Sequence, residues 1–312
     1  MRTLRADLHV HSCHSRQSGN FRFLKSRDCY STPAAVYQTA KARGMDLVTI
    51  TDHDSIGGCL EFLDTHPDAR DFFVSEEVSC RLPDGDIEVH IGVYGQTERL
   101  HRELQPLRRN VFDATACLRQ AGVFFTLNHL LHFYREQIDL GDYLRLIPEF
   151  PGLEVRNGAM LPAHNQLIES LAAPGGQPIA ALVGGSDAHT LRRVGQTWTE
   201  APGEDLVSFL QGIRERRSTV GGAHGCASSV LGDTYGVIGR YWMTLLGRGP
   251  RDHTALERLA FLLFAIVSLP AQLPLPIALV TSGKRAEARQ IRALEAWLDE
   301  SSAESVAAWM RA

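Results

Sequence analysis

The sequence predicts an α/β protein built around a parallel sheet. Short apolar runs recur along the chain, and each is followed at once by small or polar residues. Runs of this length suit strands that are buried on both faces. They lie at 45–50, 87–93, 123–127, 153–155 and 179–183. Stretches with the features of helices separate these runs, and strands that alternate with helices typically form a parallel sheet, either open or closed into a barrel.

The first helix has the clearest boundaries. Thr32 is a suitable N-cap, Pro33 fits a first turn, and Gly44 favours termination after a helix over 34–43. Further helices are expected at about 97–121, 162–173 and 203–216.

Composition narrows the classes of function. The 312 residues carry 36 acidic and 32 basic side chains, a net charge of −4, so the chain lacks the basic surplus of an extended nucleic-acid-binding protein. Hydrophobic residues make up 44 %, enough for a large core and too many for a disordered chain. The six cysteines form no CxxC pair and no apolar leader precedes the first polar motif, which favours reduced thiols and a cytoplasmic protein.

The character of the chain changes near residue 225. The polar motifs that follow apolar runs cease there, and the remainder has helical periodicity, with a break at 245–250 and an amphipathic charged helix at 285–297. The sequence therefore predicts an α/β unit over 1–225 and a helical C-terminal extension over 226–312.

One part of this extension, 259–280, is largely apolar and long enough to raise the question of a membrane span. Pro270, Pro274 and Pro276 argue against a span, because prolines interrupt the hydrogen bonds that a helix in lipid must make internally. We expect a buried or docking helix over 259–269 followed by a proline-rich connector, with membrane association through 259–280 as the minor alternative.

Residues that ligate divalent metals recur at the ends of the apolar runs. Residues i and i+2 of an extended strand project from one face, so His9 and His11, and likewise Asp187 and His189, each aim two donors the same way. Imidazole nitrogens and carboxylate oxygens suit zinc, manganese or iron. The donors come from separated segments, and a barrel would gather them on one rim: His9, His11, His53, Glu77, His90, His129, Asp187 and His189.

These motifs together resemble those of the PHP (polymerase and histidinol phosphatase) family. The resemblance covers about residues 4–225, and several motifs recur in the family's order, at 7–12, 50–54, 76–78, 89–92, 128–129 and 185–189. It implies a distorted (β/α)7 barrel with two or three divalent metal ions at the C-terminal ends of its strands, and hydrolysis of phosphate esters.

The resemblance also implies a ligand set for each metal. One metal would be held by His9, His11, Glu77 and Asp187. A second would be held by Glu77, His90 and His129, with Glu77 as the bridge. A third would take His53 and His189, and the catalytic residues would be Glu77 and Asp187.

The sequence departs from the family pattern after the first motif. A further ligand to the third metal usually follows there, but Arg16 and Gln17 stand in this stretch. His14 or Asp28 are candidates for the missing ligand, and Arg16 is a candidate to bind a phosphate oxygen, since a guanidinium cannot ligate a metal.

The expected reaction is hydrolysis of a phosphate ester of a small metabolite or nucleotide through a hydroxide that bridges two metals. Arg156, Arg192 and Arg193 lie beside the expected rim and are candidates to bind the phosphate, although arginines in such loops often form surface ion pairs. Two alternatives stay open: a metallohydrolase that attacks a carbonyl, and a non-catalytic metal-binding docking domain. The oligomeric state is left open.

Overall fold

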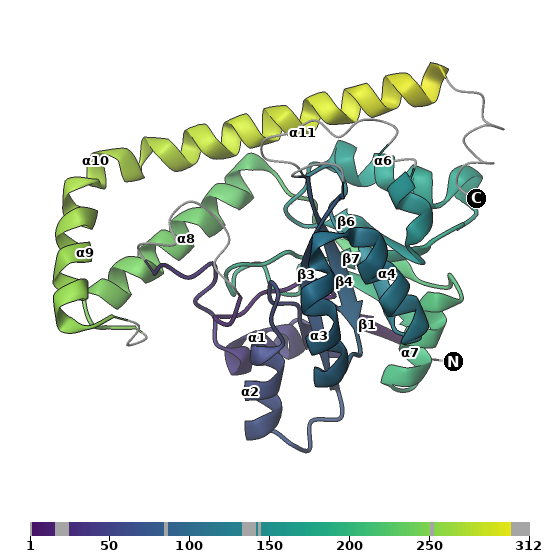
Figure 1. Ribbon diagram of the computed structural model, residues 1–312, viewed down its shortest axis with the longest axis horizontal. Coiled ribbons are helices and arrows are strands. Elements are labelled where there is room, and N and C mark those ends of the chain that lie inside the picture. The colour runs from purple at the N-terminus through teal and green to yellow at the C-terminus, as the bar shows by residue number, and fades with distance from the viewer. Residues whose placement is uncertain are drawn as a thin grey trace.

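The computed structural model describes residues 2–15, 25–83, 87–132, 142, 145–249 and 253–300. In these residues the protein has a mixed α/β fold with two sheets (Figure 1). The larger sheet has six strands in the order β2-β3-β4-β5-β6-β7, and the smaller has three in the order β1-β8-β9. The chain's central sheet is therefore covered by helices, as the sequence predicts.

The predicted apolar runs all form strands of the larger sheet. These are β2 (Val48–Ile50), β4 (Glu88–Tyr94), β5 (Phe124–Leu127), β6 (Gly152–Asn157) and β7 (Ala181–Gly185). The sixth strand, β3 (Phe72–Arg81), is not among the predicted runs. The sheet is not wholly parallel, because β4 is antiparallel to both β3 and β5. The prediction of a parallel sheet is wrong at this strand, since residues 82–87 are too few to form the crossover helix that a parallel connection needs.

Residues 9–11 lie between the ends of β2 and β7. The backbone N–H of Thr51 donates to the carbonyl of Val10 at 2.8 Å, and the N–H of His11 donates to the carbonyl of Ala188 at 3.1 Å. The larger sheet is therefore curled, with this segment hydrogen-bonded to both of its edges at one end.

The smaller sheet is antiparallel and lies against the open side of the larger one. It consists of β1 (Thr3–Ala6), β8 (Thr197–Pro202) and β9 (Thr219–Gly222). Its inner side chains share a buried cluster with α7 (Leu206–Arg214), and Phe124 of β5 and Val183 of β7 enter the same cluster from the larger sheet. The two sheets thus enclose one core.

The first helix, α1 (Pro33–Ala42), begins and ends where the sequence predicts. The Thr32 hydroxyl accepts a hydrogen bond from the N–H of Ala35, and Gly44 follows the helix with φ of +81°. The other helices around the sheet are α2 (Gly57–Thr65), α3 (Glu98–Leu104), α4 (Val111–Gln120) and α6 (Pro162–Ala172).

The single helix expected over 97–121 is divided into α3, a 3₁₀ turn over Gln105–Arg109 and α4. Pro106 favours the tight turn, and the Asn110 side chain accepts a hydrogen bond from the N–H of Phe112 and caps α4. A second large core fills the space between these helices and the outer face of the sheet.

The C-terminal extension is helical, as predicted, and we call it the arm. It comprises α8 (Ala227–Leu245), α9 (Ala255–Val267), α10 (Leu269–Gln272) and α11 (Pro274–Glu300). Figure 1 shows α8 leaving the α/β part of the protein, α9 forming the far end of the arm and α11 returning across the top of the molecule. Ile291 and Leu294 of α11 are buried in the outer core, so the arm is fixed at both ends.

The expected proline-rich connector is absent from the arm and this prediction is wrong. Pro270 lies in the first turn of α10 and Pro274 begins α11, where a proline costs no hydrogen bond. The prolines therefore mark a corner between helices. The division into units at residue 225 stays a prediction.

Candidate metal centre

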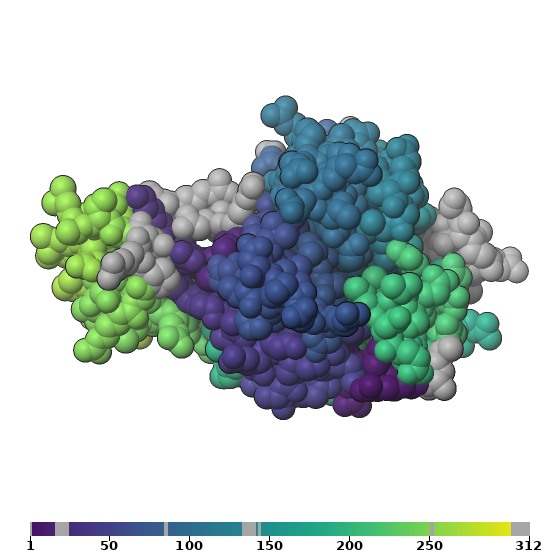
Figure 2. All heavy atoms as spheres, turned by 90° about the horizontal axis from the view of Figure 1, so that it is seen from below, coloured from purple at the N-terminus to yellow at the C-terminus, as the bar shows by residue number. Residues whose placement is uncertain are grey.

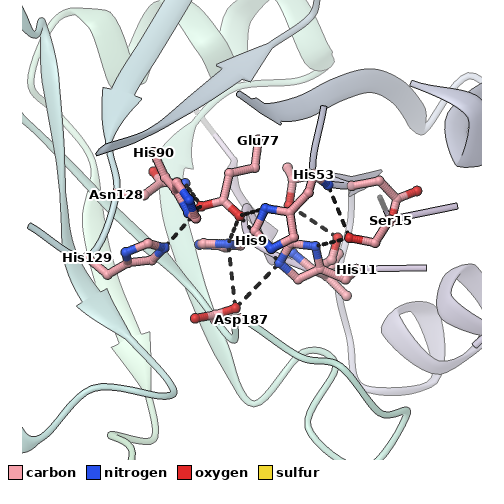
Figure 3. A network of polar contacts seen from close by, with 12 residues as sticks. His9, His11, Ser15, His53, Glu77, His90, Asn128, His129 and Asp187 are labelled. Atoms are coloured by element: carbon pink, nitrogen blue, oxygen red, sulfur yellow. Dashed lines mark hydrogen bonds and ion pairs between the residues drawn. The ribbon is translucent and has the colours of Figure 1, made fainter. Parts of the chain in front are cut away.

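The eight predicted metal-binding residues lie together at one end of the curled sheet. They come from the segment between β2 and β7, from the loops after β2, β5 and β7, and from within β3 and β4 (Figure 3). Parallel strands of an α/β sheet bring the residues at their carboxyl ends to one edge, which explains why distant parts of the sequence meet here. The eight side chains thus gather at one rim of the sheet, as the sequence predicts.

Glu77 is at the centre of this group and is fully buried. One carboxylate oxygen, Oε2, lies 3.1 Å from both His9 Nε2 and His53 Nδ1. The other, Oε1, lies 3.1 Å from His129 Nε2 and 3.2 Å from His90 Nδ1. One carboxylate therefore contacts four imidazoles from four different parts of the chain, as a bridging ligand requires.

Asp187 joins the cluster from the loop after β7. Its Oδ1 lies 3.4 Å from His11 Nε2, 3.6 Å from His9 Nε2 and 3.7 Å from His189 Nδ1. The prediction that 187–189 are extended is wrong for Asp187, whose φ is +50°. This left-handed conformation costs on the order of 1 kcal/mol or more for a residue with a side chain, and the hydrogen bond from its N–H to the His9 carbonyl at 2.7 Å helps hold it.

Asp28 completes a third group of donors. Its Oδ2 lies 3.0 Å from His189 Nε2 and 3.7 Å from His53 Nε2. Asp28, His53 and His189, together with His11, can each offer an atom within 4.8 Å of the others. Of the two candidates for the missing ligand, Asp28 is therefore the one whose carboxylate lies beside His53 and His189.

The other candidate for the missing ligand is His14. His14 lies away from the group, with its Nε2 2.6 Å from Glu61 Oε2. Arg16 and Gln17 lie outside the described residues.

Two side chains hold the cluster in place without having been predicted to do so. Glu154 of β6 accepts from His9 Nδ1 at 2.8 Å and from the backbone N–H of His129 at 2.9 Å. Asn128 donates to Glu77 Oε1 at 3.0 Å. Partners of this kind fix the orientation of a ligand. The signal for Glu154 is an acidic residue inside an apolar run, and Asn128 belongs to the motif at 128–129 but was not predicted to have a role.

Several buried atoms of the cluster make no hydrogen bond within the described parts of the chain. They are His9 Nε2, His11 Nε2, His53 Nδ1, His90 Nδ1 and Glu77 Oε2. Buried polar atoms without partners are rare in proteins because they are costly, and each needs an explanation. Imidazole nitrogens and carboxylate oxygens are the donors that zinc, manganese and iron accept, so these residues fit divalent metal ions.

The acids and imidazoles of the cluster hold one another in their charged forms. Burial would raise the pKa of Glu77, but His9, His90 and His53 hold that pKa well below its usual range. Burial would lower the pKa of His90, but Glu77 and Glu88 together outweigh burial and raise this pKa to about 10. The carboxylate at the centre is therefore ionised, which is the form that binds a metal.

The three predicted phosphate-binding arginines have protein partners. Arg193 is buried, donates to the Ser186 carbonyl and lies 3.3 Å from Asp233 of α8. Arg192 donates to a backbone carbonyl of α8, and Arg156 lies 3.8 Å from Glu169 of α6. Their role in substrate binding stays a prediction, and it requires each guanidinium to exchange its present partner for a phosphate.

A family model and a curated relative match parts of the chain. Residues 162–218 match the family described as PHP-associated. In sequence, 58 residues are 40 % identical to the uncharacterized protein MJ1587 of Methanocaldococcus jannaschii, which is 19 % of this chain and 33 % of that protein. The chain therefore matches about a third of the length of this curated relative.

Among solved structures, PsfC from Pseudomonas syringae has a TM-score of 0.52 at 18 % identity, over 77 % of this chain and 99 % of PsfC. A two-domain protein from Bacteroides vulgatus, described as containing a predicted PHP-like metal-dependent phosphoesterase, has a TM-score of 0.49 at 18 % identity, over 71 % of this chain and 65 % of its own. The likeness to PsfC extends over most of the α/β fold. The PHP-associated match, on a chain with these motifs and this fold, confirms the resemblance of the protein to the PHP family.

Proposed function

We propose that the protein is a metal-dependent phosphoesterase that hydrolyses a phosphate ester of a small metabolite or nucleotide. The observation that carries the proposal is Glu77, a buried carboxylate with an imidazole within 3.2 Å on four sides. We also propose that the six-stranded sheet and the segment at 7–11 correspond to the (β/α)7 barrel of the PHP family.

The proposed ligands form three sets, two of which share Glu77. His9, His11, Glu77 and Asp187 would hold one ion. Glu77, His90 and His129 would hold a second, with Glu77 shared between them. Asp28, His53 and His189 would hold a third, which adds Asp28 to the set that the family resemblance implies. Each set takes its donors from at least two separate segments, so a ligand set exists only in the folded chain.

When bound, such ions lower the pKa of water and neutralise the negative charge of a phosphate, which is the chemistry that ester hydrolysis needs. The chain's own residues supply the positions. Glu154 accepts from His9 Nδ1, so the Nε2 atom of His9 is directed toward Glu77 and Asp187. Asn128 fixes the other side of the Glu77 carboxylate. The arrangement keeps the donors oriented before substrate arrives.

The proposed substrate is small because the chain has no surplus of positive charge. A net charge of −4 gives no general attraction for a polyanion such as a long nucleic acid. A single phosphate group would be attracted by the metal centre itself and by any arginine of the rim that exchanges its partner.

The experiment is an assay of three ester classes with one preparation of the full chain. The protein is stripped with a chelator, reloaded separately with Zn²⁺, Mn²⁺ or Fe²⁺, and given p-nitrophenyl phosphate, bis-p-nitrophenyl phosphate and p-nitrophenyl acetate. The proposal expects metal-dependent release of nitrophenol from one or both phosphate esters. It also expects the loss of this activity in Glu77→Gln.

The other outcomes identify the alternatives. Turnover of the acetate alone would indicate a metallohydrolase that attacks a carbonyl. Full metal loading without turnover of any of the three esters, or of a panel of phosphorylated metabolites and nucleotides, would indicate a metal-binding docking domain. Either result contradicts the proposal.

A further inference from the structure

The arm exposes most of the large apolar side chains that the described surface shows. Thirteen such side chains are well exposed in the described residues, and all except Val207 belong to the arm. They are Leu246, Leu256, Leu259, Leu263, Phe264, Ile266, Val267, Leu269, Leu273, Leu275, Ile277 and Leu279. Isolated exposed apolar residues are ordinary, but a contiguous group of this size marks an interaction surface.

We call this group of twelve side chains the apolar corner. Helix α9 is its clearest part. Of its residues only Ala265 is buried, whereas Leu263 is 56 % exposed and Val267 is 80 % exposed. A helix that is apolar on nearly all sides is normally enclosed by a protein core or by lipid. The barrel does not enclose α9, so another apolar phase must cover it for the exposed surface to be stable in water.

Residues 259–283 carry no charged side chain, and the exposed charges that follow on α11 are first basic and then, from Glu295 onward, acidic. On α11 the next exposed charged side chains are Arg285, Arg289 and Arg292, which share one face by their spacing of four and three residues. The acid between them, Glu287, is buried and lies 2.5 Å from Lys284. An uncharged apolar surface is thus continuous with a stripe of three arginines.

The arm is bent at the apolar corner, and contacts from α8 hold this bend. The pair Ala255–Val267 and Leu269–Glu300 is bent by 68°, and no single helix in the described part of the chain is long and apolar enough to cross a bilayer. The bend is braced from α8, because Trp242 Nε1 donates to Gln272 Oε1 at 2.8 Å and the Tyr235 hydroxyl donates to the Leu273 carbonyl. Figure 2 shows the arm projecting from the side of the barrel.

We propose that the apolar corner inserts into one leaflet of a bilayer that contains anionic lipids. The leucines and Phe264 would enter the boundary between headgroups and acyl chains, and Arg285, Arg289 and Arg292 would lie at the level of the phosphates. Apolar residues beside a cationic stripe are typical of segments that lie in a membrane interface, and the arginine stripe complements anionic headgroups. The inference does not depend on the reaction proposed above.

A second copy of the chain is a less suitable partner for this surface. A symmetric pair needs the same face to match itself over a broad, complementary area. The apolar corner spans two helices that are bent by 68° from each other and so is not one flat face, whereas a bilayer is deformable and can surround a protruding corner. The arginine stripe would also face its own copy in many symmetric pairings, and like charges repel.

The experiment is co-sedimentation of the full chain with sucrose-loaded vesicles. One vesicle type is phosphatidylcholine alone, and the other contains phosphatidylserine as well. The apolar variant combines Leu263→Gln, Val267→Gln and Leu273→Gln. Its matched control is Val207→Gln, which replaces a side chain that is 76 % exposed on α7 of the barrel.

The charge variant combines Arg289→Gln and Arg292→Gln, and its control combines Arg70→Gln and Arg99→Gln on the barrel surface. We expect binding of the natural chain to be stronger on anionic vesicles and weaker at high salt. The apolar variant should lose about 1,000-fold in partitioning, since each of its three apolar side chains removed from contact is worth about tenfold. The charge variant should lose about 20-fold on anionic vesicles only.

Three results would overturn the inference. The first is failure of the natural chain to bind either vesicle. The second is equal binding by the apolar variant and the natural chain. The third is a lipid-free dimer, measured by light scattering, that the apolar variant dissociates while vesicle binding is absent, because this would assign the apolar corner to a second copy. Circular dichroism and the ester assay on the variants show that the barrel is intact.

Discussion

Glu76 and Glu77 are neighbours in β3, yet their carboxylates lie on opposite faces of the sheet. Glu77 contacts His9, His53, His90 and His129 inside the curled sheet, whereas Glu76 Oε2 lies 2.6 Å from His101 Nδ1 of α3 on the outside. Successive side chains of a strand point to opposite faces of the sheet. For this reason Glu77 is a proposed ligand, whereas its neighbour Glu76 forms a structural ion pair. The sequence-based choice of Glu77 as the bridge agrees with this arrangement.

This pair provides a matched test of the metal centre. Glu77→Gln should remove at least one metal ion per chain and reduce phosphate ester hydrolysis by about 1,000-fold or more, because an amide cannot bridge two cations as a carboxylate does. Glu76→Gln should keep both metal content and activity within a few fold and lower only the thermal midpoint. Metal analysis and the ester assay on both variants check this. Equal loss in the two variants would show that the effect is structural.

Asp28 offers a test of the third donor group. Asp28→Asn should lower the number of bound metal ions by one while the other ions remain, because Asp28 contacts His53 and His189 but neither His90 nor His129 in the described contacts. His14→Asn is the control, since His14 pairs with Glu61. Elemental analysis of the purified chains gives the counts. A lower count in the His14 variant, with an unchanged count in the Asp28 variant, would reverse the assignment.

Glu154 is expected to act by orienting His9. Replacement by Gln keeps the shape of the side chain but removes the charge that His9 Nδ1 contacts at 2.8 Å. Losses of partners of this kind typically cost 10–100-fold in metal affinity or activity, and we expect a loss in about this range. A competition titration with a metal indicator measures the affinity. If affinity and activity both stay at the level of the natural chain, Glu154 has no orienting role.

His164, which is not one of the proposed ligands, gives a pH-dependent prediction. It is fully buried in α6, and burial lowers its pKa to about 3, below the usual 6.5. Since the folded pKa is the lower one, its contribution to stability is complete above pH 6.5 and is lost as the pH falls from 6.5 toward 3. The loss should be about 1.4 kcal/mol per pH unit within this window.

Urea unfolding of the natural chain and of His164→Gln, both loaded with the same metal, measures this effect at pH 7.5, 6 and 5. The stability of the natural chain should fall more steeply with acid than that of the variant, so the difference between them should shift in favour of the variant. Two parallel pH profiles would show that the His164 imidazole is not kept neutral by burial.

Much of the fold and of the candidate site could be predicted because the signals are local. An apolar run followed by a histidine or an acid marks both a buried strand and the edge to which its end contributes, as at 45–50 before His53 and at 123–127 before His129. The boundaries of α1 follow from Thr32 and Gly44 for the same reason.

The parts that could not be predicted depend on contacts between distant segments. Asp28 reaches His189 from a stretch of sequence without periodicity, and no local rule places its carboxylate. The direction of β4 depends on the length of the connection at 82–87, and the left-handed conformation of Asp187 depends on the hydrogen bond of its N–H to His9. In the arm, each proline was compatible with either a connector or a first helical turn, and packing against α8 decides between them.

The most direct test of the central claim is a crystal structure of the full chain grown with Mn²⁺, with anomalous scattering used to locate the metal. The account predicts at least two anomalous peaks that share the Glu77 carboxylate, with His9 and Asp187 at one and His90 and His129 at the other. A metal-replete crystal with no anomalous peak in contact with Glu77 would contradict it.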